Sequence, residues 1–379
     1  MKKQLPVYRT QEVGFSMDYL PFSLEYTNYI HSIFVITTST VLLFSNFLLL
    51  YVIFTTPTDH IGSYRFLLAL FSVNDIAITL GYAALQPYIH MASTGFYIFP
   101  RHGGIMISGC QCYQIMLNIS IQSTFAVPVD TLLCTLFIGT FYHMFLLLAF
   151  QFVYRYKTVT RGIGSSCTDY WSKCQWTTIG AVIYALYMAV YLMAVEIGMK
   201  PSDAARESMP TEIYATYGVN LSDPTAGFLV VAVRNVNDTT NDVDWNVEST
   251  ISLALSVGLF GAVSFIIAYC IHQISMAIES SKTPVAPATR KAHREMFRAL
   301  LMQTIVPCMC SYIPLSTILL VGSVTGIPLG TYGNALFITT AIFPTLNAVF
   351  VLYFVTKFRN AVVHTFKLPS AWAEAPVKL

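Results

Sequence analysis

The stretch VDTLLCTLFIGTFYHMFLLLAFQFVYRYKTV, residues 129–159, decides the fold class of this chain. Between 129 and 154 the only charged side chain is Asp130, and the first basic residue, Arg155, follows directly. About 20 largely apolar residues are enough for a helix to cross the ~30 Å hydrocarbon layer of a bilayer. We therefore expect a membrane-spanning helix at 129–154.

The composition of the whole chain also indicates a membrane environment. Of its 379 residues, 55% are hydrophobic and only 11% are charged. A soluble domain carries about a quarter charged residues, because it needs a surface that water can wet. The composition therefore excludes an ordinary soluble domain and predicts that lipid covers much of the surface.

Six other stretches are long and apolar enough to form spans. Together with the first, they predict spans at 31–54, 65–89, 129–154, 176–198, 249–274, 296–322 and 334–356. The predicted fold class is thus an all-α membrane protein, a seven-transmembrane helix bundle. A weaker apolar stretch at 105–127 is rich in amide side chains and is interpreted as an ordered loop or short helix. The alternative is an eighth span, which would invert the topology at one end.

The distribution of basic residues predicts the orientation. With the N-terminus outside, the inner segments carry 14 of the 21 lysines and arginines. Because cytoplasmic segments are enriched in these residues, we place residues 1–30 outside the cell and residues 357–379 in the cytoplasm. Glycosylation sequons at Asn118, Asn220 and Asn237 all fall outside in this orientation, which supports it independently.

Two segments between and after the spans have a distinct pattern. Segment 199–248 carries eight acidic residues against three basic ones. This predicts either a solvated, glycosylated loop or a negative field that steers cations to the extracellular mouth. In the tail, Phe358, Val362 and Phe366 form one apolar stripe at helical spacing. We expect a short amphipathic helix that lies on the inner leaflet.

Patterns of enzyme chemistry are missing from the sequence. It has no zinc-protease His-Glu pattern, nucleotide-binding glycine loop or nucleophile elbow. The seventh span has no lysine before Lys357, which argues against a retinal Schiff base, and no arginine ladder suggests a voltage sensor. We expect no enzyme activity, no cofactor, no metal site and no nucleic-acid partner, which leaves a receptor.

Five segments of the chain match the pattern of a known family. They are IGSYRFLLALFSVNDI (61–76), LQPYIHMASTGFYIFP (85–100), LLLAFQFVYRYKTV (146–159), FRALLMQTIVP (297–307) and IFPTLNAVFVLYFVTKFRNAV (342–362). Together they resemble the nematode seven-transmembrane chemoreceptors of the Str superfamily, most closely serpentine receptor class r and its relatives. The resemblance covers nearly the whole chain, although Asn347 and Ala348 stand where the family usually has Asp-Pro.

The resemblance implies a G-protein-coupled chemosensory receptor of the odorant type in the plasma membrane of a sensory cell. Such a receptor binds a small-molecule ligand outside and activates a heterotrimeric G protein inside. It also implies that Arg155, which stands between Tyr154 and Tyr156, lies beside the G-protein docking cleft. The alternative for Arg155 is a plain cationic anchor at the inner interface.

Polar residues and prolines within the spans are candidates for the activation switch. Asp75 lies near the middle of the second span, where a carboxylate costs about 2.5–3.5 kcal/mol on insertion scales. It should face the bundle interior, either as a cation site or proton-linked switch, or as a structural group hydrogen-bonded to Asn74 or Asn347. Pro307, four residues after Gln303, is the preferred hinge of the sixth span.

Pro344 interrupts the seventh span in the same way, and the outer halves of the spans supply pocket candidates. These candidates are Asp130, Phe137, Phe141, His143, Tyr187, Tyr312 and Thr339. An aromatic lining suits a small, fairly hydrophobic odorant. The alternative for each aromatic residue is ordinary packing between helices, and for Asp130 a solvated position at the outer mouth.

Two other functions stay open at the level of sequence. One is a seven-helix transporter or ligand-gated cation channel, with Asp75 and Glu196 on its path. The other is a receptor-like protein that has lost signalling.

Overall fold

The computed structural model describes residues 24–56, 64–101, 129–160, 173–207, 209–223, 226–236, 243–279, 287–331, 333–334 and 346–367. The apolar stretch 105–127, the sequons at Asn118 and Asn237, and the site candidates Thr339 and Pro344 lie outside these residues.

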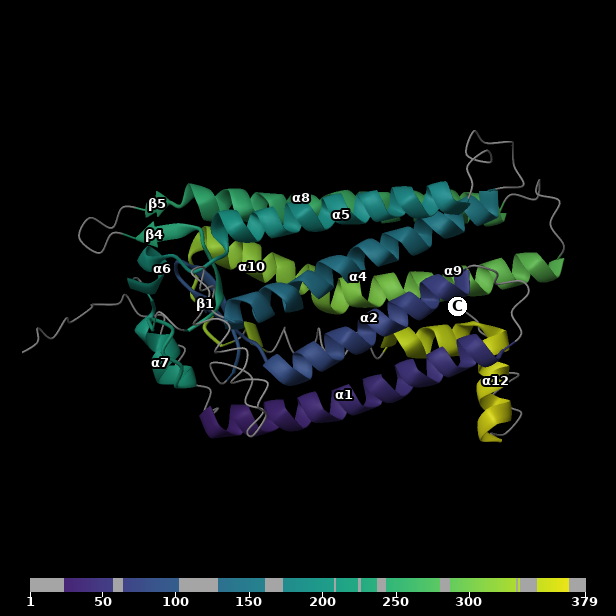
Figure 1. Ribbon diagram of the computed structural model, residues 1–379, viewed down its shortest axis with the longest axis horizontal. Helices are drawn as coiled ribbons and strands as arrows, with labels where there is room; N and C mark the ends of the chain where they lie inside the picture. The colour runs from purple at the N-terminus through teal and green to yellow at the C-terminus, as the bar shows by residue number, and fades with distance from the viewer. Residues whose placement is uncertain are drawn as a thin grey trace, which may run out of the picture.

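Six helices in this part of the chain are long and apolar enough to cross a membrane, and seven are present if one bent pair counts as a single span. The first five spans lie in α1 (Leu24–Thr55), α2 (Tyr64–Leu85), α4 (Val129–Thr160), α5 (Lys173–Gly198) and α8 (Val247–Glu279). They run along the long axis of the molecule (Figure 1).

The sixth span has three parts: α9 (Pro287–Pro307), the π-helix η2 (Cys308–Tyr312) and α10 (Ile313–Thr325). The bent pair consists of Leu346–Phe354, at the end of the predicted seventh span, and α12 (Thr356–Phe366), which turns away from it by 96°.

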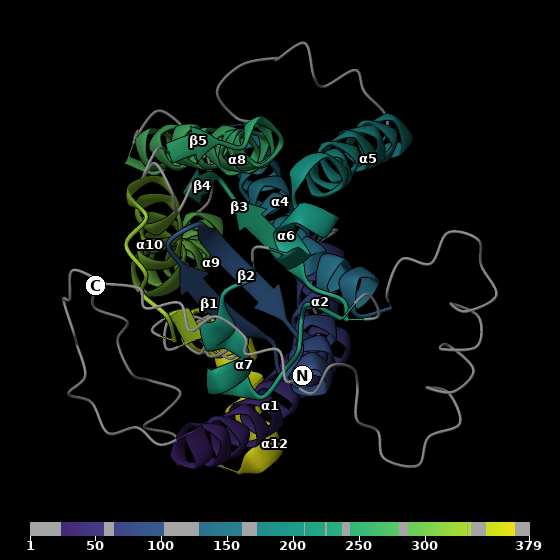
Figure 2. The same cartoon turned by 90° about the vertical axis from the view of Figure 1, so that its left-hand side faces the viewer.

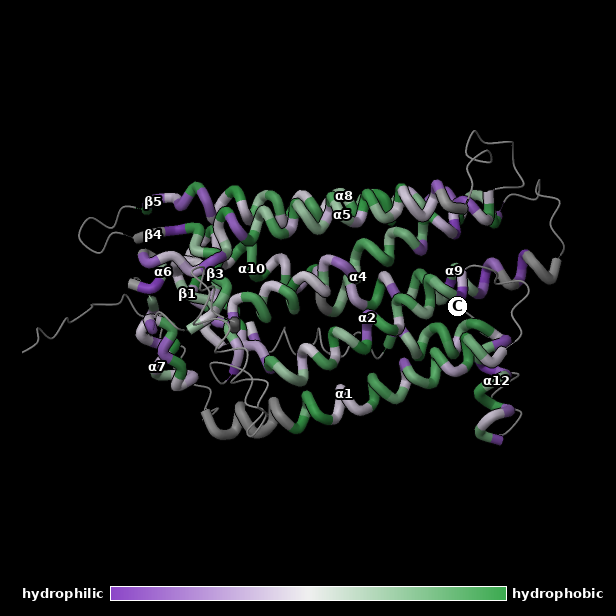
Figure 3. Tube along the Cα trace, in the orientation of Figure 1, coloured by the Kyte–Doolittle hydropathy of each residue, from purple (hydrophilic) through white to green (hydrophobic). Residues whose placement is uncertain are grey.

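The outer faces of the helices are suited to lipid. Large apolar side chains such as Phe44 and Phe47 of α1 and Phe265 of α8 are exposed, and apolar residues follow the helices along most of their length (Figure 3). Several threonine hydroxyls in the spans bond within their own helix: Thr79 and Thr304, for example, donate to the carbonyl four residues earlier. Such local bonding is needed because lipid offers no partner to polar groups.

The second span is shorter than predicted. The prediction extended it to residue 89, but α2 ends at Leu85. Pro87 has no N–H for a helical hydrogen bond, and Gln86 before it adopts a left-handed backbone with φ 42°. Ile89 therefore belongs to a strand and not to the span.

Three strands form a small sheet that the sequence did not reveal. They are β1 (Tyr88–Ala92), β2 (Gly95–Phe99) and β3 (Leu229–Ala232), paired antiparallel in the order β1-β2-β3. β1 and β2 follow the second span, whereas β3 lies between the fourth and fifth spans. The sheet crosses the end of the bundle opposite α12, and we call it the lid (Figures 1 and 2).

Both faces of the lid are buried. Because side chains alternate along a strand, Met91, Ile98 and Val231 join the core of the helix bundle, while Tyr97 and Phe99 face outward. The outward face is covered by two short helices, α6 (Asp203–Glu207) and α7 (Thr211–Tyr217), and a separate hairpin of β4 (Arg234–Val236) and β5 (Val243–Trp245) lies beside it. The lid thus forms a buried layer at the end of the bundle.

Asn334, the first residue of the predicted seventh span, forms hydrogen bonds to the lid and to the helix that covers it. Its Oδ1 accepts the backbone N–H of Ile89 at 2.8 Å, and its Nδ2 donates to the Tyr217 hydroxyl at 2.9 Å. Next to them, His90 lies 3.9 Å from the carboxylate of Glu212. Burial lowers the pKa of His90 to about 4, so the imidazole is neutral at physiological pH.

Gly95 permits the pairing of β2 with β3, and replacing it by alanine should open the lid. A Cβ atom at this position would overlap the backbone carbonyl of Val231 on the neighbouring strand. We expect Gly95→Ala to lower the unfolding temperature in detergent and to speed amide hydrogen exchange in residues 229–232. Gly180→Ala is the matched control, because a Cβ there meets nothing within 4 Å. Equal exchange in the two variants would contradict this account of the lid.

Candidate functional site

Arg155 lies in a cage of uncharged side chains at the inner end of the bundle. It is only 3% exposed, and its Cζ lies 3.7 Å from the ring centre of Tyr64 on α2. The ring of Tyr64 stacks on that of Tyr154 at 5.6 Å. Arg155 Nη2 also donates to the sulfur of Met296 on α9 at 2.8 Å. We call Tyr64, Tyr154, Arg155 and Met296 the arginine cage.

The arginine cage holds the charge of Arg155 without an ion pair. Within the described ranges no carboxylate forms a salt bridge with Arg155, and its Nε atom has no hydrogen-bond partner. A cation over an aromatic face contributes about 2 kcal/mol or more when desolvated. The cage therefore holds the charge between α2, α4 and α9 while leaving part of its hydrogen-bonding capacity unused.

The residue next to Met296 makes a second contact at the same end. Thr356, the first residue of α12, donates its backbone N–H (3.2 Å) and its hydroxyl (2.8 Å) to the two carboxylate oxygens of Glu295. The first N–H groups of a helix have no partner within it, and a negative charge there is favourable. We call this pair of residues the latch, because it ties the start of α12 to α9.

Asp75 lies in a buried polar group further inside the bundle. Its Oδ2 accepts a hydrogen bond from Asn347 Nδ2 at 3.3 Å, and the backbone carbonyl of Asn347 accepts one from Gln303 Nε2 at 3.2 Å. All three side chains are at most 2% exposed. The structure thus joins the second, sixth and seventh spans through three residues, with Asn347 rather than Asn74 as the partner of Asp75.

The sixth span changes its helical form directly after Pro307. η2 occupies the five residues from Cys308 to Tyr312, and α10 continues from Ile313. Proline removes a backbone donor and crowds the preceding turn, and single π-turns of this kind are common at functional sites. The site of the predicted hinge is therefore a local departure from α-helix.

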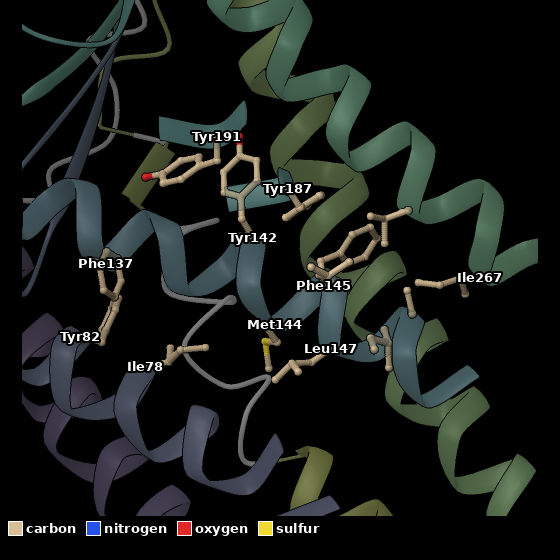
Figure 4. Close-up of a cluster of buried hydrophobic side chains, with 14 of the residues drawn as sticks. Ile78, Tyr82, Phe137, Tyr142, Met144, Phe145, Leu147, Tyr187, Tyr191 and Ile267 are labelled. Atoms are coloured by element: carbon tan, nitrogen blue, oxygen red, sulfur yellow. The ribbon is translucent and has the colours of Figure 1, made fainter. Parts of the chain in front are cut away.

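An aromatic cluster lies between η2 and the lid. Tyr142 is at its centre, with ring centroids 4.4 Å from Tyr191, 4.6 Å from Phe260 and 6.3 Å from Tyr187. Phe145 lies one turn further along α4 and contacts Phe260 at 5.3 Å and Tyr312 at 5.4 Å. We call these six residues the aromatic cluster; they come from α4, α5, α8 and η2, and Figure 4 shows part of it.

The comparisons with known proteins agree on the family. The model described as "Serpentine type 7TM GPCR chemoreceptor Str" matches residues 31–363. The chain belongs to this family. This confirms the resemblance drawn from the sequence motifs.

One relative supports this conclusion, and one solved structure shows the fold. "G-protein coupled receptor str-33" of Caenorhabditis elegans is 19% identical over 322 residues, which cover 85% of this chain and 86% of that protein. The crystal structure of squid rhodopsin has a TM-score of 0.58 at 11% identity, covering 96% of this chain and 90% of that one. The latter likeness shows the fold: a seven-helix receptor bundle.

In this Str-family receptor, the candidates for coupling and switching lie in three different places. Tyr154 and Arg155 belong to the arginine cage, whereas Tyr156 faces α8, where its ring lies 6.2 Å from that of Tyr269. Asp75, Gln303 and Asn347 are brought together.

The pocket candidates are also divided. Tyr187 and Tyr312 belong to the aromatic cluster, while Phe137 and Phe141 contact each other at 5.2 Å on the side toward α2. His143 lies against Tyr184 of α5, with ring centroids 5.2 Å apart, and is not one of the residues of the cluster. Asp130 is buried at the outer end of α4, beneath the segment that leads into β3.

Sequence reasoning missed Tyr64, Glu295 and Met296. Tyr64 stands in the GSYR motif beside Arg65, and Glu295 is the single acidic residue in the basic run from 290 to 298. These are local signals in the sequence, and they do not indicate which residues the side chains contact. The exposed sequon at Asn220 is the one predicted glycosylation site within the described residues.

Proposed function

We propose that this chain is a chemosensory receptor of the plasma membrane that binds a small, fairly hydrophobic ligand and activates a heterotrimeric G protein. The N-terminus lies outside the cell, and the arginine cage and latch face the cytoplasm. The family and the seven-helix fold support a receptor, and the geometry of the inner end supports coupling.

The observation that carries the proposal is how α9 is held at its inner end. Adjacent residues attach it to two different helices: Met296 to α4 through Arg155, and Glu295 to α12 through Thr356. Both contacts break together if the inner end of α9 moves outward. That movement would free Arg155 to contact a G protein, so the structure corresponds to a resting state.

The sixth span also supplies a route from the ligand to this end. Tyr312 belongs both to the aromatic cluster and to η2, directly after the Pro307 hinge. A ligand that displaces its ring changes the contacts of the hinge itself. Gln303, one turn before Pro307, then carries the change to Asn347 of the seventh span.

A cation path is less well supported. The sequence placed Asp75 and Glu196 on such a path, but Glu196 is exposed on α5 and pairs with Lys200 at 2.7 Å. Asp75, in contrast, is buried and bonded to Asn347. The two carboxylates do not share one environment.

The test uses purified receptor in liposomes with heterotrimers of the Gi/o, Gq and Gs classes. We expect the receptor to accelerate nucleotide exchange on at least one of them, above liposomes without receptor, since a minor active population exists without ligand. Ion flux in the absence of G protein, without any acceleration of exchange, would instead establish the channel or transporter.

A further inference from the structure

One hydroxyl group in the aromatic cluster differs from the threonine hydroxyls of the spans. Thr79, Thr135 and Thr304 each donate to the carbonyl four residues earlier in their own helix. In the described part of the chain, the hydroxyl of Tyr187 has no hydrogen-bond partner, whereas that of Ser256 interacts with the Tyr142 hydroxyl. Both side chains are more than nine-tenths buried, at 8% and 7% exposure.

Both side chains adjoin Tyr142. Tyr187 reaches it from α5, with ring centroids 6.3 Å apart, and Ser256 of α8 lies beside its hydroxyl. The neighbouring tyrosines do have acceptors: Tyr191 donates to the backbone carbonyl of Thr135 at 2.7 Å, and Tyr312 donates to the sulfur of Met144 at 3.7 Å. Among these hydroxyls of the described residues, the unused donor is that of Tyr187.

A buried donor without an acceptor is costly in a membrane interior, because no solvent replaces the missing bond. The rings of Tyr142, Phe260 and Phe145 supply apolar contact, and no described residue offers an acceptor within hydrogen-bonding distance of the Tyr187 hydroxyl. A ligand with one acceptor atom and an apolar body would match both the unused donor and the surrounding aromatic rings.

The surroundings of Tyr187 do not favour a charged ligand. Asp130 lies 12 residues from Tyr142, about 18 Å along α4. Asp75 lies nearer to Tyr312, but its carboxylate already accepts from Asn347. A charged ligand at Tyr187 would lose its hydration without gaining an ion-pair partner.

We infer that the Tyr187 hydroxyl binds the acceptor oxygen or nitrogen of a neutral, mainly apolar ligand held in the aromatic cluster. This inference rests on the proposed function and specifies its ligand class. Ethers and esters carry such an acceptor without a donor of their own, so they are the simplest probes.

The first measurement needs no ligand. We expect Tyr187→Phe to leave the unfolding temperature of the purified receptor unchanged or higher, because the lost hydroxyl had no partner. Tyr191→Phe should lower it, since the hydrogen bond from the hydroxyl to the Thr135 carbonyl is lost. A clear loss of stability in Tyr187→Phe would show that the hydroxyl is already bonded within the protein, and would overturn the inference.

The second measurement compares molecules of equal shape. Dibutyl ether is paired with nonane, and pentyl acetate with 2-methyl-1-octene, in the liposome nucleotide-exchange assay. The oxygen compound should act at about 10-fold lower concentration, the usual value of one buried hydrogen bond. Tyr187→Phe should abolish this advantage, whereas Tyr184→Phe, one turn away on α5 and outside the aromatic cluster, should keep it.

Failure of this inference is distinguishable from failure of the proposed function. If the unsubstituted receptor accelerates exchange but prefers the hydrocarbons, responds only to amines or carboxylates, or responds to none of the probes, the ligand class is wrong. If Tyr187→Phe keeps the preference for oxygen, the assignment to Tyr187 is wrong. A receptor that never accelerates exchange on any heterotrimer contradicts the proposed function instead.

Discussion

Arg155→Leu should abolish nucleotide exchange, with a loss of about 100-fold or more. Two strong charge-assisted contacts to a partner contribute roughly 1.5–3 kcal/mol each, so losing them removes at least this factor. Leucine fills the same apolar space beside Tyr64 and Met296, and the resting fold should survive. The measurement is exchange by receptor in liposomes, made in a background with high basal activity so that it needs no ligand.

Lys157→Leu is the matched control for this experiment. Lys157 stands two residues further along α4, where its ammonium lies 3.5 Å from the ring centre of Trp176 on α5. Both substitutions remove one positive charge from the same helix end. If Arg155 is only a cationic anchor, the two variants will lose activity equally, and the proposed role of the arginine cage is then wrong.

Glu295→Ala should raise basal exchange about 10-fold. The substitution removes the acceptor of both Thr356 donors and frees the inner end of α9 from α12. A differential contact worth about 1.4 kcal/mol changes the ratio of resting to active receptor by a factor of ten. Basal exchange in liposomes measures this directly, and this variant also supplies the background for the Arg155 experiment.

Two controls separate the latch from a general effect of charge. Glu279→Ala removes an exposed carboxylate at the cytoplasmic end of α8 and should leave basal exchange near the starting value. Thr356→Ala should raise exchange by itself, but should add little to Glu295→Ala, since both remove one contact. Fully additive effects of the two substitutions would be inconsistent with a latch.

The sequence alone determined the parts of this protein that depend on its solvent. Runs such as 129–154 must be helical in lipid, because only a helix satisfies every backbone group within one segment. For the same reason the carboxyl group of Asp75 and the proline at position 307 stood out as exceptions in the sequence. The family also followed from the sequence, since the YRY motif around Arg155 and the Gln303–Pro307 spacing are local patterns.

Only the tertiary structure decided which of these residues meet. Arg155 and Met296 are 141 residues apart, Ile89 and Asn334 are 245 apart, and Asp75 and Asn347 are 272 apart. Hydropathy assigns each span to the membrane. It does not predict how the helix is rotated or which helices it contacts, because apolar residues on all sides of a helix do not distinguish one arrangement from another. The lid, the latch and the unused hydroxyl of Tyr187 depend on that packing, so they appear only when the helices are placed together.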